Sequence, residues 1–411
     1  MSWPSDFLWG TGASSTQCEG AAPASDWKAW EVAGRVPPSG EGSGFATRYR
    51  EDFALYRQLG LNQHRLSIEW ARIEPQPGRV DDAAVDHYRE VLAAAREAGI
   101  AVWVCLHHFT LPAWFAAAGG FLDPALRSGA WIRHVERIAE LFGDQVAGWK
   151  PVNEPHAYAL LGWMGMGFPP GASDRDGYLA ALEAIQLATA EAGVRLRQSG
   201  RPVATVHNLA PVVALDDASA PVADFIDAGM WRTWLGLQRD GVLAVPGRAP
   251  IARPDLAGWA DLIGFSYYFT LGLQRGGVVP YPAGAPLSPL GYAIGADGLR
   301  LVLERLAREL PATPLLISEY GVGTHDDAQR AAYLRDGLAI ARDALADGTP
   351  LRGFFHWTGV DNYEWRHGYD VPFGIIDRER RVRDSAAVLS AEALGAAATT
   401  GHVSCATGSS S

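Results

Sequence analysis

Cysteine is scarce in this chain of 411 residues. Its three cysteines, Cys18, Cys105 and Cys405, lie far apart and show neither the spacing of a metal site nor that of a disulfide framework. We therefore expect a reducing, cytoplasmic compartment, and the sequence implies no metal ion and no organic cofactor.

Long apolar runs are missing as well. No stretch approaches the roughly 18 residues of a membrane-spanning helix, and the first residues, MSWPSD, lack the basic and apolar segments of a signal peptide. Lysine is nearly absent, with Lys28 and Lys150 as the exceptions, which we interpret as a coding bias toward arginine. The net charge of −11 argues against nucleic acid or an anionic membrane as a partner.

What the chain does have is an alternation of strand-like and helix-like segments. Apolar residues make up 48% of it, an ordinary share for a protein with a large core. Eight apolar runs are predicted strands: 7–13, 64–70, 101–108, 146–154, 202–208, 261–268, 314–319 and 351–357. Stretches rich in Ala, Leu, Arg and Glu at helical spacing are predicted helices: 81–99, 124–142, 177–198, 297–310 and 326–347.

This alternation predicts the fold class. Strands that alternate with helices pair in parallel, and eight of them close into a barrel. We expect an α/β protein with a single (β/α)8 TIM barrel over residues 1–395, although the length alone would suit two or three domains of about 150 residues. The last segment, 396–411, is small and polar, and we predict that it is disordered.

Two carboxylates at predicted strand ends indicate the chemistry. Glu154 lies in the segment WKPVNEP (149–155), and Glu319 lies in LLISEYG (315–321). Two carboxylates on separate strands are what cleavage of a glycosidic bond needs, one as acid and the other as nucleophile or base. Either glutamate alone would more often be a helix cap or an ion-pair partner, so the interpretation depends on its surroundings.

A sugar site also needs polar side chains for the hydroxyls and flat side chains for the pyranose faces. Such residues gather at the predicted C-terminal ends of the strands, which is where barrels of this kind carry their active sites. The densest run is FFHWTGVDNYEW (354–365), which places Glu364 between Trp357 and Trp365. Tryptophan is usually a core residue, but a glutamate between two of them is unusual in a core.

Together these motifs resemble glycoside hydrolase family 1, the β-glucosidase and β-galactosidase family. FLWGT (7–11) with Gln17 and EG (19–20) is similar to its N-terminal signature, and LHHFTLP (106–112) is similar to its His-Trp-Asp-Leu-Pro loop. VNEP (152–155) resembles the acid/base motif, and ISEYG (317–321) resembles the nucleophile motif. The run 357–365 resembles the sugar-clamping segment, and FGIID (373–377) resembles the element after it. The matches run in family order over nearly the whole chain.

The resemblance implies a retaining exo-β-glycosidase. Such an enzyme hydrolyses terminal non-reducing β-D-glycosyl residues of small glycosides or oligosaccharides through a covalent glycosyl-enzyme. It implies that Glu319 is the nucleophile, that Glu154 is the acid and base, that Tyr268 hydrogen-bonds Glu319 and that Arg65 pairs with it. The substrate-binding residues that it implies are Gln17, His108, Asn153, Asn208 (nearer the aglycone), Ser266, Trp357, Glu364 and Trp365.

Electrostatics gives the two glutamates different roles. The charged form of a carboxylate beside Arg65 and the Tyr268 hydroxyl is favoured, as a nucleophile requires. Glu154 faces that negative charge, so we expect its pKa to be raised until Glu319 is esterified by the sugar. We expect the two carboxyl groups to lie about 5–5.5 Å apart, the separation of retaining enzymes.

Several residues depart from the family pattern. Ser266 stands for the asparagine of an Asn-Tyr-Tyr element, and Tyr320 stands for the asparagine of Glu-Asn-Gly. Phe109 and Thr110 replace a tryptophan and an aspartate, and Pro151 stands where threonine is common. We expect these changes to affect the substrate and the efficiency but not the reaction class.

Four alternatives stand beside hydrolysis of an unphosphorylated glycoside. Family members that use 6-phosphosugars tend to have serine at the position of Glu364. A carboxylate there would repel a phosphate, so we expect an unphosphorylated sugar. A transglycosidase acting on a small-molecule glycoside stays open. An inactive sugar-binding homologue would need neither Glu154 nor Glu319, so the presence of both argues against it. Endo-acting cellulases with Asn-Glu-Pro lack a segment like 357–365, which argues against that class.

Overall fold

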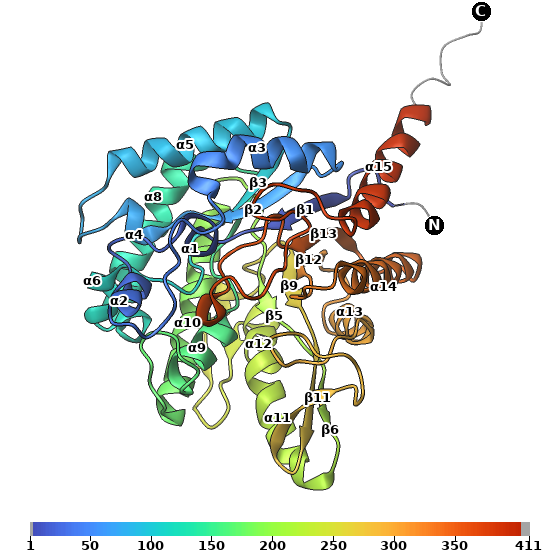
Figure 1. Ribbon diagram of the computed structural model, residues 1–411. Coiled ribbons are helices and arrows are strands. Elements are labelled where there is room, and N and C mark those ends of the chain that lie inside the picture. Colours follow the sequence, from blue (N-terminus) through green and yellow to red (C-terminus); the bar gives the residue numbers. More distant parts are fainter. Residues whose placement is uncertain (1–2, 404–411) are drawn as a thin grey trace, which may run out of the picture.

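The computed structural model describes residues 3–403, and its centre is a sheet of eight parallel strands (Figure 1). In sheet order the strands are β4 (Gly148–Lys150), β3 (Ala101–Cys105), β2 (Gln63–Ser67), β1 (Leu8–Gly12), β13 (Leu351–Trp357), β12 (Leu315–Tyr320), β9 (Ile263–Tyr267) and β5 (His207–Asn208). Each of the eight predicted strands contains one of these or overlaps it. The α/β barrel prediction is therefore confirmed.

The sheet closes where β4 meets the segment that leads into β5. Trp149 and Val203 form a parallel bridge, and the Trp149 and Ala204 backbone amides donate to the carbonyls of Pro202 and Trp149 at 2.9 Å. Both strands are shorter than predicted. Pro151 has no N–H to continue the ladder of β4, and the chain before β5 makes only isolated bridges.

Five helices occupy the predicted helical segments and lie outside the barrel (Figure 1). Three of them begin at aspartates whose side chains accept backbone N–H groups, Asp81, Asp174 and Asp326, the usual chemistry of a helix N-cap. The five are α5 (Asp82–Glu97), α8 (Ile132–Phe142), α10 (Arg175–Arg197), α13 (Asp297–Glu309) and α14 (Asp327–Ala346).

Further helices, most of them short, lie in the connections between strands and at the C-terminal end of the described chain. The other α-helices are α1 (Ser15–Glu19), α2 (Asp26–Val32), α3 (Phe45–Gln58), α4 (Trp70–Ile73), α6 (Ala113–Ala117), α7 (Pro124–Leu126), α9 (Pro155–Trp163), α11 (Ala220–Asp227), α12 (Thr233–Asp240) and α15 (Ala386–Val403). Single turns of 3-10 helix lie at Gly120–Leu122, Asp217–Ser219, Pro254–Leu256 and Trp365–His367, and of π-helix at Arg127–Trp131 and Ala228–Arg232.

A second sheet, which the strand pattern did not predict, lies beyond the end of β9. It joins β6 (Val212–Ala214), β10 (Thr270–Gln274) and β11 (Gly277–Tyr281), and Figure 1 shows β6 and β11 beside α11 at the lower end of the molecule. A two-stranded ribbon of β7 (Val242–Leu243) and β8 (Ile251–Ala252) completes the strands. Because β10 starts two residues after Tyr268, this sheet is attached directly to the predicted site.

The described part of the chain ends in one more helix. Helix α15 extends from Ala386 to Val403, so it continues into the segment 396–411 that was predicted to be disordered; residues 404–411 lie outside the described residues. Within residues 3–403, no helix is both long and apolar enough to cross a membrane.

Candidate active site

A cavity of about 480 Å³ opens at the C-terminal ends of the barrel strands. Nine of the twelve predicted site residues line it: Gln17, His108, Asn153, Glu154, Tyr268, Glu319, Trp357, Glu364 and Trp365. The other three, Arg65, Asn208 and Ser266, lie behind this lining. The strand ends therefore bring together residues that are more than 340 positions apart in the chain.

Glu319 lies in β12 and is almost fully buried. The Arg65 Nη1 group forms a short ion pair with its Oε1 atom, and the Tyr268 hydroxyl donates to its Oε2 atom at 2.5 Å. Both partners stabilise the ionised carboxylate, because an opposite charge and a donated hydrogen bond favour the charged form. The side chain is thus prepared to act as a nucleophile.

Arg65 organises the floor of the cavity from the middle of β2. Its side chain is fully buried, and its Nη2 group donates to Asn153 Oδ1 at 2.7 Å and to His108 Nδ1 at 2.7 Å. Burial and the Arg65 charge hold the pKa of His108 well below its usual value, so the ring is neutral and one of its nitrogens can accept a hydrogen bond. The guanidinium also lies 5.3 Å from the Trp357 ring.

Glu154 lies in the loop between β4 and helix α9. It precedes Pro155 at the start of α9, in a left-handed backbone conformation with φ of 46°, and its N–H donates to Val206 O at 2.8 Å. Burial and the nearby Glu319 charge raise the pKa of Glu154 to about 8, against smaller opposing effects of Ser266 and Arg65. Near neutral pH the side chain therefore carries a proton that it can donate.

The backbone is strained at several points around the cavity. Phe109, Glu154 and Trp365 are three of the five non-glycine residues with positive φ in the described chain, and all three line the cavity. Such conformations cost about 1–3 kcal/mol each and persist where the surrounding structure enforces them, commonly at functional sites.

Gln17 and Glu364 form a polar pair on another part of the wall. Gln17 Nε2 donates to Glu364 Oε2 at 3.1 Å, and the Ser14 hydroxyl donates to Gln17 Oε1 at 2.7 Å. Burial, Glu319 and Glu154 raise the pKa of Glu364 to about 8. This arrangement presents an amide and a carboxyl group side by side, as recognition of neighbouring sugar hydroxyls requires.

Aromatic rings form the rest of the inner wall. The His108 ring is nearly parallel to Trp357 and Trp365, with centroid distances of 5.7 and 6.1 Å. The Trp365 ring packs against Trp27, with a centroid distance of 4.8 Å, and against Phe168, at 5.5 Å. These contacts fix the two tryptophans in the cavity wall.

Two predicted residues contact the lining from behind. Asn208 is half-buried at the end of β5, where its Nδ2 group lies 3.1 Å from His156 Nδ1. The pKa of His156 is lowered to about 4 by burial, so this ring nitrogen is free to accept. Ser266 is buried in β9 in register with Glu319, and its side chain acts to lower the pKa of Glu154.

Four of the residues that depart from the family pattern differ in whether they line the cavity. Phe109 lines the cavity. Tyr320 is buried away from it, stacked on Tyr333 with a centroid distance of 4.5 Å and donating to Tyr333 O at 2.7 Å. Thr110 is buried and donates to Glu69 at 2.9 Å, and Pro151 follows the end of β4. Only Phe109 among these four therefore faces the substrate space.

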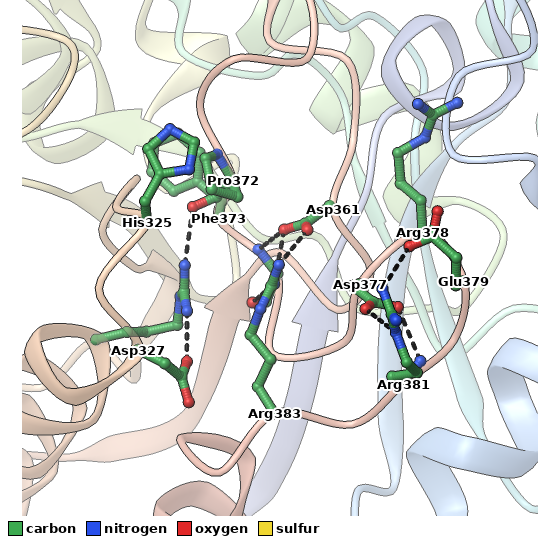
Figure 2. Close-up of polar contacts among 12 residues, drawn as sticks. His325, Asp327, Asp361, Pro372, Phe373, Asp377, Arg378, Glu379, Arg381 and Arg383 are labelled. Carbon is green, nitrogen blue, oxygen red and sulfur yellow. Dashed lines mark hydrogen bonds and ion pairs between the residues drawn. The ribbon is translucent and has the colours of Figure 1, made fainter.

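The segment after β13 is braced by ion pairs, as Figure 2 shows. Arg383 forms a two-pronged pair with Asp361, at 2.9 and 2.5 Å, and donates to Gly374 O at 2.6 Å. The Gly374 N–H donates to the same Asp361 carboxylate at 2.8 Å. This brace ties the run that carries Glu364 and Trp365 to the segment that carries Phe373, another lining residue.

Several cavity-lining residues were missed by the sequence reasoning. The missed residues are mainly apolar or aromatic: Phe109, Leu161, Met166, Phe168, Phe269, Leu290, Tyr292, Arg366, His367 and Phe373. Apart from Phe109, which was noted only as a departure, and Phe373, which opens the FGIID motif, no local pattern distinguishes them from core residues. Among residues 3–403 we find no group of three or more His, Cys, Asp or Glu side chains arranged to hold a metal ion.

Known proteins are similar to this chain in sequence and in fold. The model of glycosyl hydrolase family 1 matches residues 1–223 and 281–391. A coniferin beta-glucosidase of Pinus contorta is 28% identical over 91% of this chain and 87% of its own length, and beta-glucosidase A of Thermotoga maritima is 26% identical over 93% and 96%. The structure of a beta-glycosidase from Pyrococcus horikoshii superposes with a TM-score of 0.88 at 29% identity, covering 96% of this chain and 95% of the other.

Proposed function

The chain belongs to glycosyl hydrolase family 1 and is a glycoside hydrolase of the β-glucosidase type, and from this premise we propose that it removes terminal, non-reducing, unphosphorylated β-D-glycosyl residues with retention of configuration. The natural substrates in this proposal are small β-glycosides or oligosaccharides. The observation that carries it is the contrast between Glu319, held by Arg65 and Tyr268, and Glu154, whose pKa is raised to about 8.

In the first step Glu319 attacks the anomeric carbon. The bond from that carbon to the leaving oxygen breaks, and Glu154 gives its proton to this oxygen, so that the alcohol departs neutral. Arg65 and Tyr268 hold the attacking carboxylate in place. The product of this step is an α-linked ester between the sugar and Glu319.

In the second step water replaces Glu319. The ester carries no charge, so the repulsion that kept Glu154 protonated is removed, and Glu154 can now accept a proton from the attacking water. The new bond forms on the β face, and Glu319 leaves as a carboxylate. A carboxyl separation of about 5–5.5 Å belongs to this proposal, because an inverting pair needs about 6.5–9.5 Å.

Recognition of the sugar is assigned to the inner wall. Gln17, His108, Asn153 and Glu364 supply donors and acceptors to the hydroxyls, and Trp357 and Trp365 supply flat apolar surface. A phosphate on the sugar would face the Glu319 carboxylate, which lines the same cavity and would repel it. We assign Asn208 and Ser266 to the support of this wall rather than to direct contact.

A reducing compartment remains our prediction. Cys18 and Cys105 are both buried free thiols, as expected where disulfides do not persist.

A panel of p-nitrophenyl β-glycosides, with and without a 6-phosphate, tests the proposal. We expect turnover of the unphosphorylated β-glucoside, with the β-galactoside or β-fucoside as slower substrates, and NMR should show the β-anomer of the free sugar first. A first-formed α-anomer, or no turnover by folded protein, would exclude the proposal. A predominance of glycosyl transfer over hydrolysis with an added alcohol would point to the transglycosidase instead.

A further inference from the structure

One of the two lysines lies inside the barrel beneath the two carboxylates. Lys150 is the last residue of β4, and both it and Ser318 are fully buried. Its Nζ group donates to Ser318 Oγ at 2.7 Å and lies 5.8 Å from the Trp103 ring and 5.3 Å from the Phe355 ring. Among residues 3–403 the amine therefore has a single hydrogen-bonding side-chain partner, and two aromatic faces cover it.

Ser318 owes its position to an irregularity in β12. Ile317 pairs with Phe265 of β9 and Glu319 pairs with Ser266, so Ser318 is an extra residue against β9. The ladder with β13 shows the same extra residue between Ile317 and Tyr320. This is a β-bulge, which re-aims side chains and is frequent beside active sites.

The bulge places two consecutive side chains on the inner side of the barrel. In a regular strand, neighbouring side chains point to opposite faces, yet Ser318 reaches Lys150 in the interior and Glu319 reaches Arg65 and Tyr268 in the cavity. Space for the Ser318 hydroxyl comes from Gly264 in β9, where an added Cβ would lie 2.4 Å from Ser318 Oγ.

The Lys150–Ser318 contact also connects the two strands that carry the catalytic pair. Lys150 lies four residues before Glu154, and Ser318 directly precedes Glu319. In the closed barrel, β5 and β9 lie between β4 and β12, so no backbone pairing joins the two strands. The lysine side chain spans this gap.

We propose that Lys150 is a positioning residue that fixes the bulge at Ser318, and with it the place of the Glu319 carboxylate relative to Glu154. The inference rests on the proposed function of the two glutamates. A buried amine is costly to maintain when its partner is a neutral hydroxyl, and burial and Arg65 lower the pKa of Lys150 well below its usual value. A methionine of similar length would fill the same space without this cost.

The test compares Lys150→Met, Ser318→Ala and the double variant with the wild type, using p-nitrophenyl β-glucoside. Displacement of a reacting group by about 1 Å costs on the order of a hundredfold, so we expect kcat to fall ten- to a hundredfold in each single variant, with KM within about threefold. The double variant should lose no more than either single variant, because all three break the same link. Lys28→Met, which removes the other lysine at the surface, should keep wild-type kcat.

Thermal melting separates positioning from a structural role. Lys150→Met should melt at the wild-type temperature or above, because it removes a buried polar group, whereas Ser318→Ala should melt lower, because it leaves the amine without a partner. Wild-type kcat in Lys150→Met, losses that multiply in the double variant, or a lowered melting temperature of Lys150→Met would each overturn the proposal. If the wild type turns over no glycoside, the proposed function fails, and the two melting temperatures alone decide whether the contact is as described.

Discussion

At the scale of single residues, Glu154 and Glu319 differ by their neighbours. The Glu319 carboxylate accepts hydrogen bonds from Arg65 and Tyr268. Burial and the charge of Glu319 raise the pKa of Glu154 to about 8. In the proposed mechanism the same chemical group therefore acts as a nucleophile at one strand end and as an acid at another. Environment, rather than residue type, assigns the role.

This difference predicts the pH dependence of the reaction. Glu154 must hold its proton in the free enzyme, so kcat/KM for a substrate with a poor leaving group should fall as pH rises through about 8. Rates measured from pH 5 to 10 with an alkyl β-glucoside check this.

The pKa of Glu364 is raised to about 8 as well. A variant is therefore needed to show which of the two glutamates causes the fall in kcat/KM. With 2,4-dinitrophenyl β-glucoside, whose leaving group needs no proton, Glu154→Gln should keep measurable glycosylation and lose the fall near pH 8. A fall that persists in Glu154→Gln would assign it to Glu364 and contradict the role given to Glu154.

At the scale of elements, the run from Trp357 to Phe373 depends on its ion-pair brace. Arg383→Gln removes the two-pronged contact with Asp361 and leaves a mostly buried carboxylate without its cation. We expect a loss of about 1–3 kcal/mol in the free energy of unfolding and a rise in KM larger than the fall in kcat, because the run carries Glu364 and Trp365. Urea denaturation and steady-state kinetics measure both.

Arg381 provides the matched control on the same segment (Figure 2). It pairs with Asp377 at 2.6 Å, but its side chain is 76% exposed, and solvent screens such exposed pairs so that they contribute little to stability. Arg381→Gln should therefore leave KM unchanged. If Arg383→Gln and Arg381→Gln changed KM equally, the contact between Arg383 and Asp361 would not be what holds the substrate-binding residues in place.

Much of the barrel could be predicted because its signals are local. Apolar runs located all eight strands, and aspartate caps such as Asp81 and Asp326 marked the helix starts. The second sheet was missed although Arg275 and Gly276, both with positive φ, form a two-residue turn of the kind that closes hairpins. Helix α15 extends to Val403, and the alanines after residue 395 are strong helix formers.

The site could be predicted only as far as its motifs extend. Residues within a motif, such as Gln17 and Glu364, are found in the cavity. The Lys150–Ser318 contact depends on a bulge that shifts the register of β12 by one residue, and no local pattern encodes such a shift. Apolar lining residues such as Phe168 and Tyr292 have the same composition as a core, and only the closed structure separates them from it.

At the scale of the whole molecule, buried titratable groups set the pH range of stability. Burial raises the pKa of Glu19 and Asp26 to about 7 and of Glu154 and Glu364 to about 8. The folded state favours the neutral forms of these carboxyl groups. Their contribution to the free energy of unfolding is therefore lost as pH rises from about 4.5 through 7 and 8.

Histidines act in the opposite direction at lower pH. Among the described residues, burial lowers the pKa of five of them to about 3 or 4: His64, His107, His156, His207 and His356. Burial also holds the pKa of His108 and His134 well below the usual value. The unfolded chain takes up protons on these rings as pH falls below about 6.5, so acid removes their stabilising effect. We expect the melting temperature to be highest near pH 6.5; a steady rise from pH 6 to 9 would contradict these assignments.

The central claim is that Glu319 is the nucleophile of a retaining double displacement, and one measurement tests it most directly. Glu319→Gly should be inactive on an activated β-glucoside and should regain turnover with azide, giving the α-glycosyl azide, because azide takes the place of the missing carboxylate. NMR of the product distinguishes its anomers. A β-glycosyl azide from this variant would contradict the account, since it would mark Glu319 as the acid/base and another group as the nucleophile.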